Sequence, residues 1–246
     1  ALLRLPAELE CSYDITVHDY YLACPQVTLA DEQGRYCGAP DEAGCNACLH
    51  KRPVAGVADI AQWRSLHAPL LAGAERIYVP CADTLQRISA YFPMIERWVH
   101  ARHEQLADMP APEGRAPRSG EPLRVLVLGA LSVFKGADTL EQVATLLRAR
   151  RAPVELHLLG YAYRTLETRP MTALQVHGAY SEGEVQERIA EIAPHVVWFP
   201  GSCPETWSYT LSAALMAGLP VIAPRIGAFP ERLAGRPWSW LVGVDR

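Results

Sequence analysis

The chain has 246 residues, of which 50% are hydrophobic and 20% are charged, and its formal net charge is −4. This composition is typical of a globular protein that is long enough for one large domain or two small ones. The weak negative charge gives no electrostatic reason to expect nucleic acid as a partner, and no apolar run approaches the ~18 residues that a transmembrane helix needs.

The first part of the chain has few and irregular secondary-structure patterns. Apolar and aromatic residues predict two strands and two helices, at 15–18, 76–79, 57–71 and 83–91. Residues 24–52, which are rich in Gly, Cys, Asp and Pro, indicate an irregular excursion instead. Because so few strands make a thin sheet, we expect 1–107 to be an incomplete Rossmann-like domain that carries a Cys-rich segment at 24–52.

A linker and a more regular second part follow. Residues 108–122 contain four prolines and two glycines with almost no apolar side chains, which is typical of a linker. In 123–246 the predicted strands are 123–128, 154–159, 174–177, 196–199 and 221–223, and the predicted helices are 136–148, 181–192 and 207–217. Ser181 and Glu184 resemble a capping box at the start of the second of these helices. This alternation predicts an α/β fold with a doubly wound parallel sheet.

Four of the seven cysteines lie close together in a segment that is too polar to make its own core. They are Cys24, Cys37, Cys45 and Cys48, and the last two form a Cys-x-x-Cys pair. Four thiolates at this spacing are typical of a tetrahedral structural zinc site without an open position for catalysis. Reduced thiols and two disulfides are the alternatives. A zinc knuckle that binds nucleic acid is disfavoured because acidic residues flank the cysteines, namely Asp31, Glu32, Asp41 and Glu42.

The segment 200–224 contains a Pro/Gly/Ser loop, a helix of small and apolar residues, and a further strand. With the preceding strand it forms one βαβ unit. Polar loops at the carboxyl ends of strands are where open α/β sheets bind ligands, and a helix N-terminus at such a loop favours anions. Taken alone, Glu205 in this loop would be a solvated acid at a helix N-terminus.

Three features of the second part occur together and in a fixed order. They are Leu128-Gly-Ala-Leu-Ser-Val-Phe-Lys135-Gly136, Pro204-Glu205-(x)7-Ala213-Ala-Leu-(x)2-Gly218-Leu-Pro220, and Arg225-Ile-Gly-Ala-Phe-Pro-Glu231. In these features the chain resembles group 1 (family 4) retaining glycosyltransferases of the GT-B fold, of the bacterial envelope or O-antigen type. The resemblance implies two Rossmann-type domains, with an acceptor-side domain in 1–107 and a donor-nucleotide-binding domain in 123–246.

The resemblance also implies a nucleotide-sugar donor in the second domain. Glu205 would bind hydroxyls of the donor sugar, and Lys135 would stabilise charge on the leaving diphosphate without a divalent cation or other cofactor. The other donor-binding residues would be Gly136, Thr206, Trp207, Ser208, Tyr209 and Thr210. Physical chemistry supports these roles independently of the resemblance, because a fixed ammonium and helix N-terminal amides lower the barrier when negative charge grows on the leaving group.

Residues 16–20, Thr-Val-His-Asp-Tyr, bring an imidazole to the carboxyl edge of the first predicted sheet. This stretch resembles the His-Asp element of the same family's acceptor-side domain. By that resemblance His18 is a catalytic-site ligand of the donor sugar, and Asp19 orients it. Some bacterial glycosyltransferases of this type carry a similar stretch that continues through the four cysteines.

Two positions depart from the family pattern. Ala213 stands where a ribose-binding Glu is usual, and Ala130 stands where an Arg is usual. The leading hypothesis is a metal-independent retaining glycosyltransferase of lipopolysaccharide biosynthesis, with a saccharide or lipid-linked acceptor. The alternative is a catalytically weak, GT-B-like sugar-nucleotide-binding protein or partner subunit. Acceptors of this kind imply a cytoplasmic protein that associates peripherally with the inner face of the cell membrane.

Overall fold

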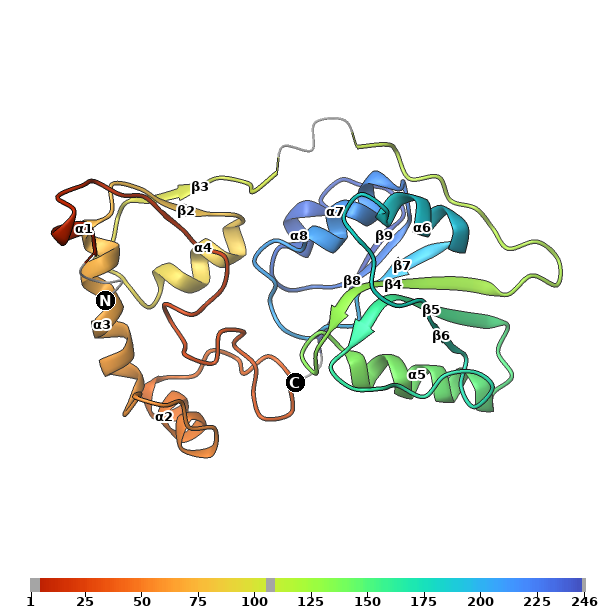
Figure 1. The fold of residues 1–246 in the computed structure, drawn as a ribbon, viewed down its shortest axis with the longest axis horizontal. Helices are drawn as coiled ribbons and strands as arrows, with labels where there is room; N and C mark the ends of the chain where they lie inside the picture. Colours follow the sequence, from red (N-terminus) through yellow and green to blue (C-terminus); the bar gives the residue numbers. More distant parts are fainter. Residues whose placement is uncertain (1–4, 105–108, 245–246) are drawn as a thin grey trace.

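The structure is a computed structural model that describes residues 5–104 and 109–244. The chain forms two lobes, each built around a parallel sheet (Figure 1), so the predicted α/β class is confirmed. Within the described residues, every helix is too short or too polar to span a bilayer. The predicted domain end at 107 and the predicted linker start at 108 lie outside the described residues, as do the chain ends at 1–4 and 245–246.

The first lobe contains a small sheet with helices around it. Its three parallel strands have the order β1-β2-β3 and comprise Ile15–Thr16, Ile77–Val79 and Trp98–His100. Its helices are α1 (Leu5–Glu8), α2 (Glu42–Lys51), α3 (Ile60–Gly73) and α4 (Ala82–Ser89). Ile77 and Val79 of the central strand are fully buried, and they pack with Leu71 of α3 and Ile88 of α4.

Parts of this lobe differ from the prediction. Residues 42–51, which we expected to be irregular, form α2 because the Asp41 carboxylate accepts a hydrogen bond from the Gly44 N–H and caps the helix. Helix α3 begins three residues later than predicted, since Asp59 caps it in the same way. Strand β3 was not predicted because three residues are too few for an alternating pattern to be visible.

The second lobe contains six parallel strands in the order β6-β5-β4-β7-β8-β9. The strands are β4 (Leu123–Leu131), β5 (Val154–Ala162), β6 (Leu174–Val176), β7 (Val196–Trp198), β8 (Val221–Pro224) and β9 (Ser239–Val242). The helices are α5 (Ala137–Ala149), α6 (Val185–Ile192), α7 (Tyr209–Met216) and α8 (Phe229–Arg232). This order is that of the predicted doubly wound sheet. The prediction missed α8 and β9, which have four residues each.

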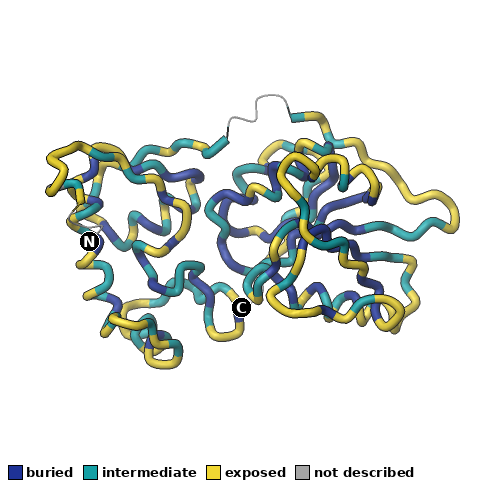
Figure 2. The backbone as a smooth tube through the Cα atoms, viewed as in Figure 1, coloured by how far each residue is buried: buried dark blue, intermediate teal, exposed yellow. Residues whose placement is uncertain are grey.

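Helices cover both faces of the larger sheet. Side chains of β4 point alternately to the two faces of the sheet. Leu126 and Leu128 pack with α6, α7 and α8 on one face, whereas Val125 and Val127 pack with α5 on the other. Figure 1 shows α5 on one side of the sheet and the other three helices on the opposite side, and Figure 2 shows buried backbone along its strands. Strands buried on both faces have nearly continuous apolar sequences, which explains why the sequence predicted them well.

The strand order reverses between β4 and β7, the two strands at the centre of the larger sheet. The loops that follow these strands touch each other there, since the Ser202 N–H donates to the Phe134 carbonyl at 3.2 Å. In open α/β sheets, ligands bind outside the carboxyl ends of the strands at such a reversal. The loops at 132–136 and 199–208 are therefore where a ligand site is expected.

A hairpin of the Cys-rich segment contacts the second lobe. Ala30 and Tyr36 form an antiparallel bridge, and Gly34 lies in the turn between them with φ of 75°. The Ser202 hydroxyl and the Cys203 thiol both donate to the Gly34 carbonyl, at 3.2 and 3.5 Å. The hairpin thus joins the lobes beside the loop that follows β7.

Helix α8 makes another contact between the lobes. Glu231 Oε2 accepts a hydrogen bond from the Ala82 N–H at the start of α4, at 2.7 Å, and Glu231 Oε1 lies 3.1 Å from His100 Nε2. The segment 109–122 then follows the second lobe without forming a helix or strand (Figure 1). The contact of the hairpin at Gly34 and the contact of Glu231 in α8 together fix the lobes relative to each other.

Candidate functional site

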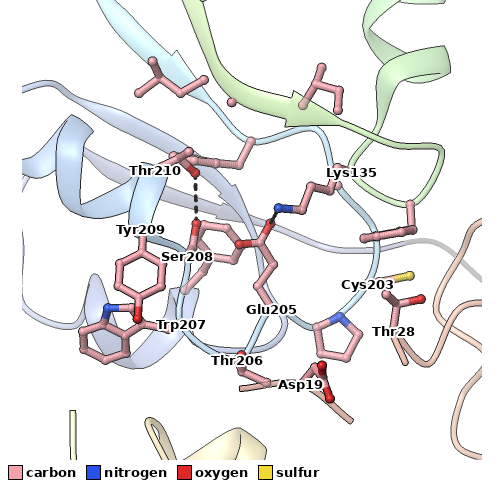
Figure 3. Close-up of a pocket in the computed structure, with 18 of the residues that line it drawn as sticks. Asp19, Thr28, Lys135, Cys203, Glu205, Thr206, Trp207, Ser208, Tyr209 and Thr210 are labelled. Carbon is pink, nitrogen blue, oxygen red and sulfur yellow. Dashed lines mark hydrogen bonds and ion pairs between the residues drawn. The ribbon is translucent and has the colours of Figure 1, made fainter. Parts of the chain in front are cut away.

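A cavity of about 410 Å³ lies between the two lobes at the strand reversal, and its volume is in the range of small-molecule sites. One wall comes from the first lobe, with the residues His18, Asp19, Tyr20, Val27, Thr28 and His103. The other wall comes from the loops after β4 and β7 and from the start of α7. Figure 3 shows Lys135 and Glu205 of these two loops pointing toward each other.

Lys135 reaches the cavity from the loop after β4. Gly136, which follows it, precedes α5 with φ of 84°, a left-handed conformation that favours glycine. A Cβ at this position would lie 2.4 Å from the Pro200 carbonyl oxygen. Because only glycine allows this approach, the loop after β4 packs against the loop after β7 and holds the Lys135 ammonium beside it.

Glu205 lies opposite, with its Oε1 3.9 Å from Lys135 Nζ. The side chains are 25% and 40% exposed, so this ion pair adds little stability and both charges are accessible to a ligand. The turn at 227–228 supports the Glu205 backbone. The Ala228 N–H donates to the Glu205 carbonyl at 2.9 Å, and a Cβ on Gly227 would come within 2.5 Å of the same oxygen.

Helix α7 begins at the cavity. Ser208, the residue before it, has φ of 73° and ψ of 85°, an uncommon conformation for a residue other than glycine. Ser208 Oγ lies 3.3 Å from Thr210 Oγ1 and, among the contacts of the described residues, makes no capping bond to the helix. The first N–H groups of a helix lack partners within it and attract anions. The N–H groups near Ser208 to Thr210 are thus suited to an anionic ligand.

Two stacked imidazoles belong to the first-lobe wall. The rings of His18 and His103 lie 4.9 Å apart with an angle of 20° between their planes, and the Thr206 hydroxyl donates to the His18 carbonyl. Burial, followed by the effect of His18, lowers the pKa of His103. The buried Nε2 of His103 has no hydrogen-bond partner within the described part of the chain. The sequence did not predict His103, because no motif surrounds it.

Cys203 is a second cavity residue that the sequence analysis did not single out. Burial raises the pKa of its thiol to about 12, so the thiol is neutral at physiological pH and unsuited to act as a nucleophile. The Cys-rich segment contributes Val27 and Thr28 to the cavity wall, and none of its four cysteines, all of which the structure describes.

The four cysteines of that segment lie near one another elsewhere in the first lobe. Burial raises the pKa of Cys24 to about 11, and the thiols of Cys37, Cys45 and Cys48 are close enough to raise it further. The Cys45 thiol donates to the Pro40 carbonyl at 3.6 Å. Over residues 5–104 and 109–244, no three potential ligands form a group that could hold a metal ion. The zinc site therefore stays a prediction.

The cavity brings together nearly all residues that the sequence proposed for the donor. His18, Lys135, Glu205, Thr206, Trp207, Ser208, Tyr209 and Thr210 line it, and Gly136 lies behind Lys135. At the two departing positions, Ala130 is exposed at the end of β4, and the Ala213 carbonyl accepts a hydrogen bond from Gln186 Nε2 at 3.1 Å.

The sequence matches no protein-family profile, and no curated protein matches it. Solved structures do match the fold. HepE from Anabaena in complex with UDP-glucose has a TM-score of 0.61 at 13% identity, over 98% of this chain and 61% of HepE. Sucrose-phosphate synthase from Thermosynechococcus elongatus has a TM-score of 0.60 at 14% identity, over 99% and 59%. The pneumococcal O-GlcNAc transferase GtfA, in complex with UDP and GlcNAc, has a TM-score of 0.56 at 13% identity, over 75% and 37%.

These structural neighbours are glycosyltransferases of the GT-B fold, and the likeness shows that this chain has the same fold. The predicted GT-B architecture is thereby confirmed. The chain spans about 37% to 61% of the length of these three neighbours. At such low identity the likeness establishes the fold alone.

Proposed function

We propose that the chain binds a nucleotide-sugar donor and transfers the sugar, with retention of configuration, to a saccharide or lipid-linked acceptor of the bacterial envelope. The observation that supports this most is the convergence of an ammonium, a carboxylate and a helix N-terminus in one cavity. Structural neighbours have been solved with UDP, UDP-glucose and GlcNAc, which supports this class of ligand.

Each group has a role that suits its chemistry. As the glycosyl bond breaks, the Lys135 ammonium and the N–H groups at the start of α7 stabilise the charge that grows on the diphosphate. The Glu205 carboxylate accepts hydrogen bonds from the sugar hydroxyls. His18 contacts the same sugar from the other lobe. Asp19 follows it in a turn that the Tyr21 N–H closes by donating to the Asp19 carboxylate at 2.8 Å.

In the proposed reaction the acceptor hydroxyl attacks from the face that the diphosphate leaves. The bond between the anomeric carbon and the diphosphate oxygen breaks, and a bond to the acceptor oxygen forms. The acceptor proton passes to the departing diphosphate. Because Lys135 supplies the positive charge, we expect the rate to be the same with and without added divalent cations such as Mg²⁺ or Mn²⁺.

Turnover tests this proposal. The chain is incubated with UDP-, GDP- and dTDP-sugars and saccharide acceptors, and release of the nucleoside diphosphate is measured. We expect release from at least one donor, and about 10²–10³-fold slower release by Lys135→Ala, the usual loss for one electrostatic donor. No release from any donor would contradict transfer, and an inverted product in NMR would contradict retention.

Ala130 and Ala213 support a second candidate, a sugar-nucleotide-binding protein or partner subunit with little activity. The family's charged residues at these positions would each contribute a charge-assisted hydrogen bond, worth about 1.5–3 kcal/mol. Saturable donor binding without turnover would identify this second function.

We further propose that the four clustered cysteines hold a structural zinc ion. Cys45 and Cys48 lie three residues apart on one face of α2, and Cys37, Cys45 and Cys48 are close enough to Cys24 to raise the pKa of its thiol. The side chains would have to close around the metal, because their present arrangement does not form a ligand group within the described residues. We expect about one zinc per purified chain and its loss in Cys48→Ser. Four thiols that react freely, or two disulfides, would contradict the proposal.

A further inference from the structure

A buried arginine lies beneath the start of α7. The side chain of Arg232, in α8, is 4% exposed and stacks on the Trp207 ring at 3.9 Å. Its Nη1 donates to the carbonyls of Trp207 and Ser208, at 2.8 and 2.7 Å, and its Nη2 donates to the Ser212 hydroxyl at 2.8 Å. One guanidinium thus holds both the turn that leads into α7 and the first turn of that helix.

The turn needs such support. Ser208 has a left-handed backbone, which is unfavourable for a residue with a Cβ. The two carbonyls that Arg232 binds flank this conformation. Their position determines the direction of the N–H groups that follow, at the start of α7.

The carboxylate that balances the charge of Arg232 belongs to Glu104, in the segment that connects the first lobe to the second. Glu104 follows β3, and its Oε2 lies 4.0 Å from Arg232 Nη2. The same oxygen accepts a hydrogen bond from the Trp207 indole N–H, at 2.8 Å, and another from the Ser212 hydroxyl. Burial lowers the pKa of Arg232 to about 10, and Glu104 opposes this effect. A buried guanidinium without its carboxylate would be strongly unfavourable.

We propose that Glu104 and Arg232 are positioning residues that order the turn at 207–208 only while the two lobes keep this arrangement. Together with Trp207 and Ser212 they form what we call the Glu104 clamp. In the described residues, neither Glu104 nor Arg232 lines the cavity, so both act through the turn. Separation of the lobes removes the carboxylate from a buried cation and loosens the turn. That the turn binds a donor phosphate rests on the proposed function.

Two variants test the clamp without large changes of shape. Glu104→Gln removes the charge, and Arg232→Lys keeps the charge but loses the planar fork of donors. The controls are Glu96→Gln, an exposed glutamate before β3, and Arg150→Lys, an exposed arginine after α5.

Hydrogen exchange measured by mass spectrometry, without ligand, gives the first readout. We expect exchange in a peptide that spans 203–212 to be about tenfold faster in both clamp variants, and unchanged in a reference peptide that spans 154–162. The controls should exchange like the wild type. Unchanged exchange in 203–212, or equally faster exchange in both peptides, would overturn the proposal.

Calorimetry with UDP, UDP-glucose and GDP-mannose gives the second readout. We expect Glu104→Gln to weaken binding about tenfold, the usual effect of one charge-assisted contact, while Glu96→Gln has no effect. Lys135→Ala should weaken binding without faster exchange in 203–212. If the wild type binds none of these ligands, the proposed function fails, and the exchange result still decides whether the clamp orders the turn. Faster exchange with unchanged affinity would overturn the positioning role.

Discussion

Replacement of Gly227 by alanine should displace the Glu205 loop. Gly227 has φ of 67°, and a Cβ there would lie 2.5 Å from the Glu205 carbonyl oxygen and 2.6 Å from the Glu205 nitrogen. Both are backbone atoms, which cannot rotate away as a side chain can, so the two loops must separate. Gly235 is a matched control, because it has φ of 72° and a Cβ there would meet nothing within 4 Å.

The size of the effect follows from this comparison. A left-handed residue with a Cβ costs about 1–2 kcal/mol relative to glycine, and both variants lose this amount. Gly227→Ala adds overpacking, which typically costs about 1–3 kcal/mol. The entropy that alanine removes from the unfolded chain is the same in both variants. Gly227→Ala should therefore be about 1–3 kcal/mol less stable than Gly235→Ala.

Thermal unfolding of both variants and the wild type measures this difference. In a chain of this size, 1 kcal/mol corresponds to roughly 2–4 °C in Tm, so Gly227→Ala should melt about 2–12 °C below Gly235→Ala. Hydrogen exchange should also become faster in a peptide that contains Glu205. Equal melting temperatures would refute the argument that the turn at Gly227 supports the Glu205 loop.

Two further perturbations test the lobe contact and the pH dependence of stability. Gly34 has φ of 75°, and the Cβ of a Gly34→Ala variant would lie 2.4 Å from Val133 Cγ1 in the second lobe. This variant should therefore loosen the hairpin contact and increase the radius of gyration measured by small-angle scattering. An unchanged radius of gyration would contradict this prediction. Burial, followed by the effect of His177, lowers the pKa of His157 from 6.5 to about 4. Between these values the unfolded chain binds more protons than the folded one, so the free energy of unfolding should fall as the pH falls from 6.5 to about 4. His157→Gln should flatten this part of the curve in urea denaturation, and an identical pH dependence in the variant would argue against the assignment.

The second lobe was predictable because its strands are buried on both faces. Leu123 to Leu128 is apolar except for Arg124, and Gly136 marks the start of α5. The start of α6 was predicted four residues too early, because Ser181 and Glu184 bond each other in a turn before the helix begins at Val185. The first lobe was less predictable. Its strands have two or three residues, and α2, which Asp41 caps, lies within a segment whose Gly, Cys, Asp and Pro residues indicate irregular structure.

The site residues that the sequence could predict lie in loops that directly follow strands. Lys135 and Glu205 lie in loops after β4 and β7, and the sheet order brings these loops together. His103, Glu104 and Arg232 could not be found in this way. The first two follow a strand of three residues, and Arg232 looks in the sequence like an exposed residue at a helix end. Arg232 meets Trp207 and Ser212 through the folding of its own lobe, and Glu104 reaches these residues only through the packing of one lobe on the other.

The central claim is that the cavity between the lobes binds a nucleotide-sugar donor. Isothermal titration calorimetry of the wild-type chain with a panel of nucleotide sugars, beginning with UDP-glucose, tests it most directly, with Lys135→Ala and Glu205→Gln measured in parallel. We expect saturable binding of at least one donor and binding at least about tenfold weaker in each variant, as for the loss of one charge-assisted contact. Absence of heat with every donor, or affinity unchanged by both substitutions, would contradict the claim.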